Sequence, residues 1–282
     1  MNTLTVNFNF YQIFETFFNP KIAVAAAEFL NKKLFSTPQA NDAMGFTRRG
    51  KRKSQNAPHL VNLVEFYTDA DIHHHTTYLV DALWEVNPHL LRDWECMTQL
   101  LLDDDSVLKH EDETALVDLL VRTVKQAAIG TPPAGRTGVS SKKATGARDR
   151  QRIIEDRQQL TDELIEPLPR LYAKFGSDRD KMILLLQIPR YFDLDSYTVN
   201  RGEKHLDDLL HELTQVVEKH AVEEILNEAA ETFAYLANPD ANICTKVKPA
   251  LRNPGFSRWV NFPFGSFPRL GHFSILIKKI FV

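Results

Sequence analysis

The sequence contains little cysteine and no long apolar run, and each absence excludes a class of protein. Cys96 and Cys244 are the only cysteines among 282 residues, too few for a disulfide framework or a four-cysteine zinc site. We expect both to be buried thiols in a reducing compartment. No apolar run approaches the roughly 18 residues of a membrane-spanning helix, and the first residues lack the basic start and cleavage site of a secretory signal. The sequence therefore predicts a soluble intracellular protein that contacts no membrane.

The chain also lacks an excess of either charge. Its 34 Lys and Arg stand against 37 Asp and Glu, for a net charge of −3. Any binding to nucleic acid must therefore depend on local basic segments. Hydrophobic residues make up 43% of the chain and charged residues 25%, which indicates a packed protein and excludes disordered, collagen-like and low-complexity chains.

Catalytic and cofactor motifs are missing as well. The sequence has no G-x-x-x-x-G-K-[ST], no H-E-x-x-H, no G-x-S-x-G and no G-x-G-x-x-G after a strand. We therefore predict no enzyme activity, no catalytic residue, no cofactor and no small-molecule substrate. The histidine triplet at 73–75 cannot converge on one metal ion, because successive side chains on a helix point about 100° apart. His205, Asp208 and Glu212 share a helical face, which we interpret as the polar side of an amphipathic helix and not as a metal site.

From about residue 20 the apolar residues recur at helical spacing, and almost none alternate as in a strand. This pattern predicts an all-α fold. The clearest stripe consists of Leu206, Leu209, Leu210, Leu213, Val216 and Val217. A second stripe begins a few residues later with Val222, Ile225, Leu226, Ala229, Ala230 and Phe233. Because the join is short, we expect these two helices to form an antiparallel hairpin.

Further helices are expected at about 21–35, 58–68, 72–87, 89–103, 111–128, 148–175 and 178–188. Helix pairs about forty residues apart are typical of a HEAT-type α-solenoid of antiparallel helix pairs. A compact bundle stays open, because no internal repeat is visible. Pro167 and Pro169 lie within one of these segments, so we expect a kink or a split there. Residues 36–57 and 131–147 are polar and are expected to be exposed loops.

Several segments resemble the stromal antigen (stromalin) subunit family of cohesin. The residues Tyr78 to Trp84 (YLVDALW) and Asp93 to Met97 (DWECM) match one family pattern. The residues Leu185 to Leu194 (LLQIPRYFDL) and Glu203 to Asp207 (EKHLD) match a second, in the same order. Shorter matches occur at 23–35, 126–136 and 217–226. The resemblance thus covers roughly residues 20–247.

The resemblance implies a middle portion of a longer HEAT-repeat protein. Its implied partners are the kleisin subunit of cohesin, the SMC heterodimer reached through the kleisin, and double-stranded DNA without sequence preference. Its implied role is sister-chromatid cohesion and chromosome segregation in the nucleus, on chromosomes. Residues 1–19 and 248–282 do not match the family and together hold 11 of the 18 phenylalanines. We expect both ends to lie outside the helical array, the second as a disordered tail, and the chain to be a truncated piece of a family member.

Two basic segments are candidates for DNA contact. The first contains Arg48, Arg49, Lys51, Arg52 and Lys53, and the second contains Arg136, Lys142, Lys143, Arg148, Arg150, Arg152 and Arg157. Residues 136–157 hold seven basic and three acidic residues, so this segment can neutralise phosphates without reading the base sequence. The resemblance adds that this portion of stromalins faces DNA. The alternatives are a solvated loop for either segment and a nuclear-import signal for the first.

Aromatic residues give the remaining candidates. Trp84 and Trp94 fall in apolar helical stripes, which favours core packing. Tyr191 and Phe192 follow Pro189 at a helix break, where they either plug a joint between repeats or line a groove for a partner helix. We thus expect a non-catalytic scaffold on chromosomes. The alternative is a helical adaptor that binds only protein.

Overall fold

The computed structural model describes residues 20–35, 54–69, 76–104, 108–130, 146–198 and 202–250. Within these ranges every regular element is a helix, so the predicted all-α class is confirmed. None of the helices in these ranges is both long and apolar enough to cross a bilayer. The chain divides into two compact units between Asp156 and Arg157.

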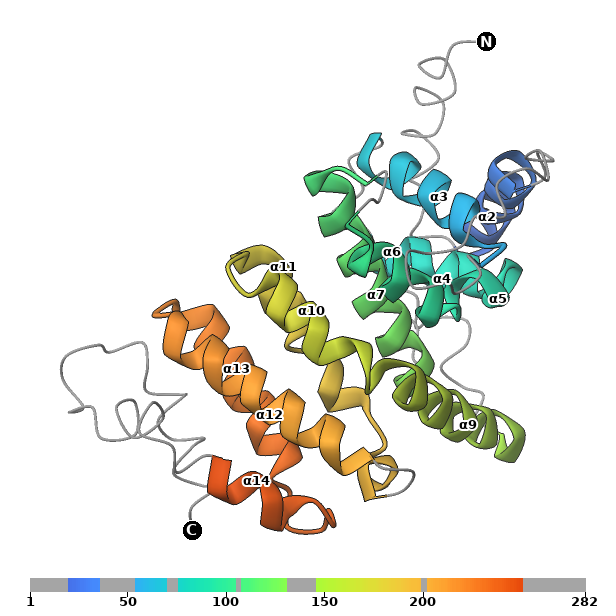
Figure 1. Cartoon of the computed structure of the whole chain (residues 1–282). Coiled ribbons are helices and arrows are strands. Elements are labelled where there is room, and N and C mark those ends of the chain that lie inside the picture. Colours follow the sequence, from blue (N-terminus) through green and yellow to red (C-terminus); the bar gives the residue numbers. More distant parts are fainter. Residues whose placement is uncertain are drawn as a thin grey trace. The chain divides into compact units, whose positions relative to one another are not determined.

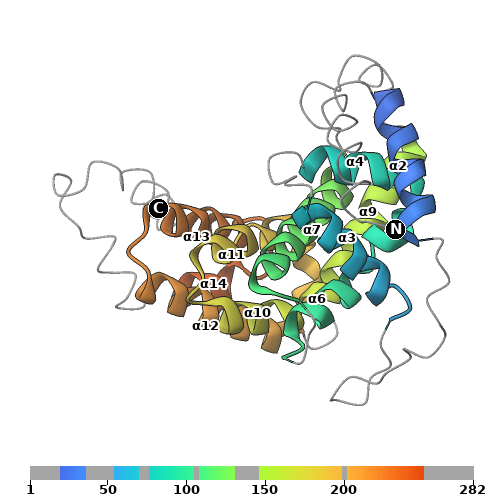
Figure 2. The same cartoon turned by 90° about the horizontal axis from the view of Figure 1, so that it is seen from above.

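Seven helices, counted over the described ranges, begin in the first unit (Figure 1). They are α2 (Pro20–Phe35), α3 (Ala57–Asp69), α4 (Thr76–Val86), α5 (Pro88–Leu91), α6 (Trp94–Leu102), α7 (His110–Ile129) and α9 (Ala147–Leu164). Helix α7 packs against α3, α4 and α6, and α2 packs against α4 (Figure 2). Because α7 lies among three helices, its residues from Ala115 to Val121 are all buried.

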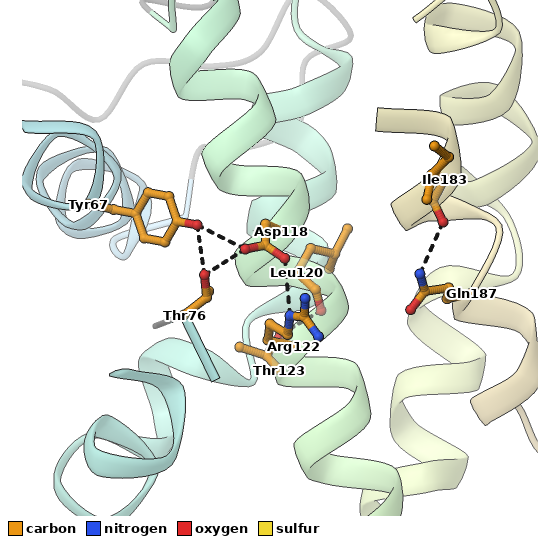
Figure 3. A network of polar contacts seen from close by, with 8 residues as sticks. All are labelled: Tyr67, Thr76, Asp118, Leu120, Arg122, Thr123, Ile183 and Gln187. Atoms are coloured by element: carbon orange, nitrogen blue, oxygen red, sulfur yellow. Dashed lines mark hydrogen bonds and ion pairs between the residues drawn. The ribbon is translucent and has the colours of Figure 1, made fainter. Parts of the chain in front are cut away.

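A polar network joins α3, α4 and α7 inside this unit (Figure 3). The hydroxyls of Tyr67 and Thr76 both donate to the Oδ2 atom of Asp118, at 2.8 Å and 2.6 Å. The Nε atom of Arg122 donates to the other oxygen of this carboxylate at 3.1 Å. Burial raises the pKa of Tyr67, and the charge of Asp118 raises it further. The phenol therefore stays protonated and remains a donor.

The helix expected at 89–103 is two helices, and that part of the prediction is wrong. Asn87 accepts a hydrogen bond from the backbone N–H of Leu90 and caps α5. Asp93 accepts one from Cys96 at 3.0 Å and caps α6. The carboxylate of Asp93 also accepts from Ser54. Two capping side chains six residues apart therefore start two separate helices. The second of them, Asp93, also links α6 to Ser54, which lies just before α3.

The predicted core packing is confirmed for Trp94, whereas Trp84 lies only partly inside. Trp94 is fully buried, and its indole N–H donates to the Thr123 hydroxyl at 3.2 Å. Trp84 is half-buried, and the guanidinium of Arg92 lies 4.7 Å from its ring centre. The same guanidinium pairs with Asp156 at 2.8 Å. Arg92 therefore connects α4 to the middle of α9.

The second unit contains α10 (Pro167–Phe175), α11 (Arg179–Leu185), α12 (Gly202–Lys219), α13 (Glu223–Leu236), α14 (Cys244–Ala250) and two 3-10 helices, η2 (Ile188–Tyr191) and η3 (Leu194–Thr198). The helices α12 and α13 lie side by side and form the predicted hairpin (Figure 1). All six residues of the first predicted stripe are buried. Of the second stripe, Val222 lies just before α13 and is half-buried, whereas the other five are buried. The two stripes therefore form the core of the hairpin.

The prolines divide the segment 148–175 as predicted. Helix α9 ends at Leu164 and α10 begins with Pro167. Proline is tolerated in the first turn of a helix because its missing N–H would have no partner there, whereas it breaks a helix interior. The buried state of Cys96 and Cys244 is confirmed. Residues 1–19 and 251–282, which include most of the two ends expected to lie outside the array, fall outside the described residues.

Candidate nucleic-acid interface

The candidate DNA-binding residues fall into two groups. The described group consists of Arg148, Arg150, Arg152 and Arg157, all on α9. The other group lies outside the described residues: Arg48, Arg49, Lys51, Arg52, Lys53, Arg136, Lys142 and Lys143. The geometry of the candidate interface is therefore the geometry of the first half of α9.

The first half of α9 is open to solvent. From Ala147 to Gln159 no residue is fully buried, and Leu160 is the first that is. Arg148, Arg150 and Arg152 are all exposed. On a helix, residues four apart are neighbours about 6 Å apart, so Arg148 and Arg152 lie on one side of α9. All three side chains are thus in contact with solvent.

The start of α9 carries a positive field from two sources. The backbone N–H groups of the first turn give a helix N-terminus about half a positive charge. Arginines there add to this charge and do not help the helix, since acidic residues are the ones that stabilise this end. Asp149 is the only acidic residue in the first turn, and it accepts a hydrogen bond from the backbone N–H of Gly146 at 3.3 Å. The exposed arginines thus contribute more to the attraction of an anion than to the stability of α9.

Arg157 has a different environment from the other three arginines. Its Nε atom donates to the carbonyl oxygen of Tyr191 at 3.1 Å, and its Nη2 atom donates to the carbonyl oxygen of Phe192 at 2.8 Å. The Nη2 atom also contacts the hydroxyl of Tyr235. That hydroxyl in turn donates to the carbonyl of Phe192 at 2.9 Å. The guanidinium of Arg157 thus holds the end of η2 against α9 and α13 within the second unit.

Tyr191 and Phe192 were expected either to plug a joint or to line a partner groove. The side chain of Phe192 is 0% exposed, and its ring centre lies 6.3 Å from that of Tyr197. Phe192 therefore packs as a plug in this conformation, where a partner cannot reach it. Tyr191 is half-buried, so a role in partner binding stays a prediction for that residue.

An ion-pair cluster that was not predicted from the sequence holds the same segment against α13. The guanidinium of Arg190 pairs with the carboxylates of Glu228 and Glu231 on α13. One turn away, the hydroxyl of Thr232 donates to the carbonyl oxygen of Leu186 at 2.5 Å. The spacing of Glu228, Glu231 and Thr232 on one helical face was a visible signal. Their partners were not visible, because they lie 38 to 46 residues away.

Among the described residues no group of three or more His, Cys, Asp or Glu side chains is placed to hold a metal ion. His205, Asp208 and Glu212 lie on α12 as predicted, on its half-buried and exposed positions. The histidines at 73–75 lie outside the described residues.

Successive packed helices are the architecture of a helical-repeat protein. The family model for the HEAT-repeats domain of cohesin subunit SCC3/SA matches residues 78–254. The chain belongs to this family, and its helical array is of the HEAT-repeat type. The match continues beyond residue 247, the predicted end of the array, and the described helix α14 reaches Ala250.

Curated relatives agree with the family model. Cohesin subunit SA-1 of Xenopus laevis is 43% identical over 235 residues, which cover 81% of this chain and 18% of the relative. Cohesin subunit scc-3 of Caenorhabditis elegans is 40% identical over 219 residues, 77% of this chain and 19% of the relative. Sister-chromatid cohesion protein 3 of Arabidopsis thaliana is 26% identical over 180 residues, 62% of this chain and 16% of the relative. The chain thus spans less than a fifth of the length of these relatives.

Proposed function

We propose that this chain is a non-catalytic part of the cohesin complex that binds the kleisin subunit and double-stranded DNA. The observation that carries this proposal is the match of the SCC3/SA family model over residues 78–254. The names of the relatives describe subunits of a complex and, in the plant relative, sister-chromatid cohesion. By this proposal the chain acts in the nucleus, on chromosomes, and reaches the SMC heterodimer through the kleisin.

DNA binds at the start of α9 in this account. Arg148, Arg150 and Arg152 are exposed there, and their charges add to that of the helix N-terminus. Arginine and the backbone N–H groups of a helix start both bind phosphate oxygens, and neither contact depends on the base sequence. The interface therefore binds duplexes of any sequence. Arg157 does not take part directly, because its guanidinium is engaged by backbone carbonyls.

The kleisin binds as an extended chain with short helices along the helical repeats. Stacked helix pairs present a long continuous surface, which suits a partner that folds as it binds. Tyr191, whose half-buried side chain lies at the end of η2, is part of this surface in the proposal.

A matched pair of variants tests the DNA site. The first variant replaces Arg148, Arg150 and Arg152 with Gln. The control replaces three exposed lysines of the second unit, Lys204, Lys219 and Lys248, with Gln, so that the net charge changes equally. We expect the arginine variant to lose at least about tenfold in affinity for a 30-base-pair duplex at 100 mM salt, and the control to lose far less. Equal losses in both variants would show that only net charge matters.

Co-purification with the kleisin tests the other half of the proposal. The wild-type chain and the arginine variant should both retain the kleisin, because the start of α9 is assigned to DNA. A chain that binds kleisin but no duplex is the protein-only adaptor that the sequence left open. A chain that binds neither contradicts the proposal as a whole.

A further inference from the structure

The start of α9 has few contacts that could fix its position. Among the described elements α9 takes part in none of the extensive helix–helix contacts. From Ala147 to Arg152 every side chain is exposed, so this stretch contributes nothing to a core. The residues that hold the start of α9 in place must therefore lie further along the helix.

One such contact is apolar and joins α9 to the end of α7. Gly130 ends α7 with a φ of 64°, which glycine adopts without strain. A Cβ atom on Gly130 would lie 2.8 Å from the Cδ1 atom of Ile153, closer than an ordinary van der Waals contact. The backbone of Gly130 thus borders α9 directly. Because apolar contact has no directional preference, it does not set the direction of the helix.

A second contact is directional. The Nη2 atom of Arg92 donates to the Oδ2 atom of Asp156 at 2.8 Å. The two side chains are only 21% and 13% exposed, so solvent and salt screen this ion pair less than an exposed one. The guanidinium also lies over the ring of Trp84, 4.7 Å from its centre, which restricts its orientation. The carboxylate of Asp156 is therefore held from one direction.

Arg92 itself has a fixed base. Its backbone N–H donates to the carbonyl oxygen of Pro88 at 3.0 Å and closes α5. The next residue, Asp93, caps the start of α6. A guanidinium with its backbone between two helices and its plane on an aromatic ring can fix the group that it binds.

We propose that Arg92 is a positioning residue for the DNA site. Through Asp156 it holds the first half of α9 in one direction and so aligns the three exposed arginines of that half with phosphates. The inference rests on the proposed binding of DNA at the start of α9. A pre-organised helix loses less freedom on binding than a mobile one, and it therefore binds more tightly. Arg92 needs no contact with DNA for this role.

Two adjacent carboxylates of α9 provide a matched test in the full chain. Asp156→Ala breaks the pair with Arg92, whereas Glu155→Ala removes an exposed carboxylate one residue away. Each variant loses one negative charge near the arginines, which by itself favours the binding of an anion. We expect Glu155→Ala to bind duplex DNA at least as tightly as the wild type, and Asp156→Ala to bind about threefold more weakly. Charge alone predicts the opposite sign for Asp156→Ala.

A substitution of Arg92 that keeps the net charge gives a second test. Arg92→Lys retains the positive charge but loses the planar guanidinium that binds Asp156 and stacks on Trp84. We expect it to weaken duplex binding about as much as Asp156→Ala does. Circular dichroism of each variant confirms that it remains folded.

Distances within the free protein test the inference without DNA. Nitroxide labels are attached through Ala147→Cys on α9 and Lys125→Cys on α7, which are exposed positions, whereas both native cysteines are buried. Pulsed electron paramagnetic resonance should give one narrow distance in the labelled wild type and with Glu155→Ala. It should give a broader distribution with Asp156→Ala and with Arg92→Lys.

Three results would overturn the inference: an affinity of Asp156→Ala for duplex DNA that rises as much as that of Glu155→Ala, an unchanged affinity of Arg92→Lys, or label distances that are the same in all four proteins. A failure of the proposed function has a different signature. The wild type then binds no duplex, and the label distances alone decide whether Arg92 positions α9.

Discussion

The Nη2 atom of Arg157 donates a 2.8 Å hydrogen bond to the backbone carbonyl of Phe192. Arg157 belongs to the basic segment 136–157, and this contact gives it a structural role. Its neighbours on the same helix, Arg148, Arg150 and Arg152, are exposed. Composition alone therefore does not distinguish Arg157 from the other three arginines. Arg157 contacts backbone carbonyls of the second unit, and the other three are exposed to solvent.

Replacement of Arg157 by Ala should lower the free energy of unfolding by about 2 kcal/mol or more, because the buried carbonyl of Phe192 loses a charged donor. Urea unfolding followed by circular dichroism measures this change. Arg152→Ala is the matched control and should change stability by less than about 0.5 kcal/mol, since its side chain is exposed. Equal effects of the two substitutions would contradict the structural role of Arg157.

The network around Asp118 predicts an order of effects in the first unit. Asp118→Asn replaces one of two accepting oxygens with an amide donor, so either the two hydroxyls or the arginine then face a donor, and the charge is lost. We expect it to cost about 2–4 kcal/mol of stability. Tyr67→Phe removes one donor while Thr76 and Arg122 still satisfy the carboxylate, so it should cost only about 1 kcal/mol. Thermal unfolding of both variants measures the order, and the reverse order would contradict the account.

Two buried tyrosines of the second unit form a matched pair. The Tyr172 hydroxyl donates to the carbonyl oxygen of Leu185 at 3.2 Å. The Tyr197 hydroxyl is equally buried, but no hydrogen-bond partner for it is found in the part of the chain that the structure describes. Tyr172→Phe should therefore destabilise the protein by about 1 kcal/mol, and Tyr197→Phe should be neutral or stabilising. A loss of stability from Tyr197→Phe as large as that from Tyr172→Phe, measured in urea, would refute this difference.

Burial raises the pKa of Cys96 to about 12, and the nearby charge of Asp93 contributes in the same direction. The native thiol should therefore resist alkylation at pH 8, whereas the urea-unfolded chain should react fully. Mass spectrometry of the peptide that contains Cys96 measures both rates. Because the folded pKa lies above the ordinary value of 9.0, the stabilising contribution of the protonated thiol is complete below pH 9 and is lost as the pH rises toward 12. Native and unfolded chains that react equally fast would show that Cys96 is accessible.

Local pattern predicted most of the helices. The stripe from Leu206 to Val217 is buried on α12, and the helix break before Pro167 lies where proline chemistry requires it. The break at Asp93 was also readable, because an aspartate before Trp-Glu-Cys is a helix cap. Hydrophobic spacing alone does not reveal this break, because the residues of α5 and α6 are apolar on both sides of it.

The parts that could not be predicted depend on long-range contacts. The partners of Arg157 lie 34 to 78 residues further along the chain, so its composition and spacing resemble those of an exposed arginine. The 3-10 helices η2 and η3 lie in a segment that is fixed by contacts with residues distant in the sequence. There the backbone N–H of Asp193 donates to the hydroxyl of Thr161 at 2.8 Å. Neither the inward role of Arg157 nor these short helices follows from local propensity.

The salt dependence of duplex DNA binding tests the central claim most directly. The logarithm of the binding constant of the 282-residue chain is measured against the logarithm of salt concentration, for the wild type and for the variant with Gln at 148, 150 and 152. The account predicts a linear fall for the wild type and a slope shallower by about one for each arginine that contacts a phosphate, up to about three. Parallel lines with the same slope would contradict it, because phosphate contact by the start of α9 would then be absent.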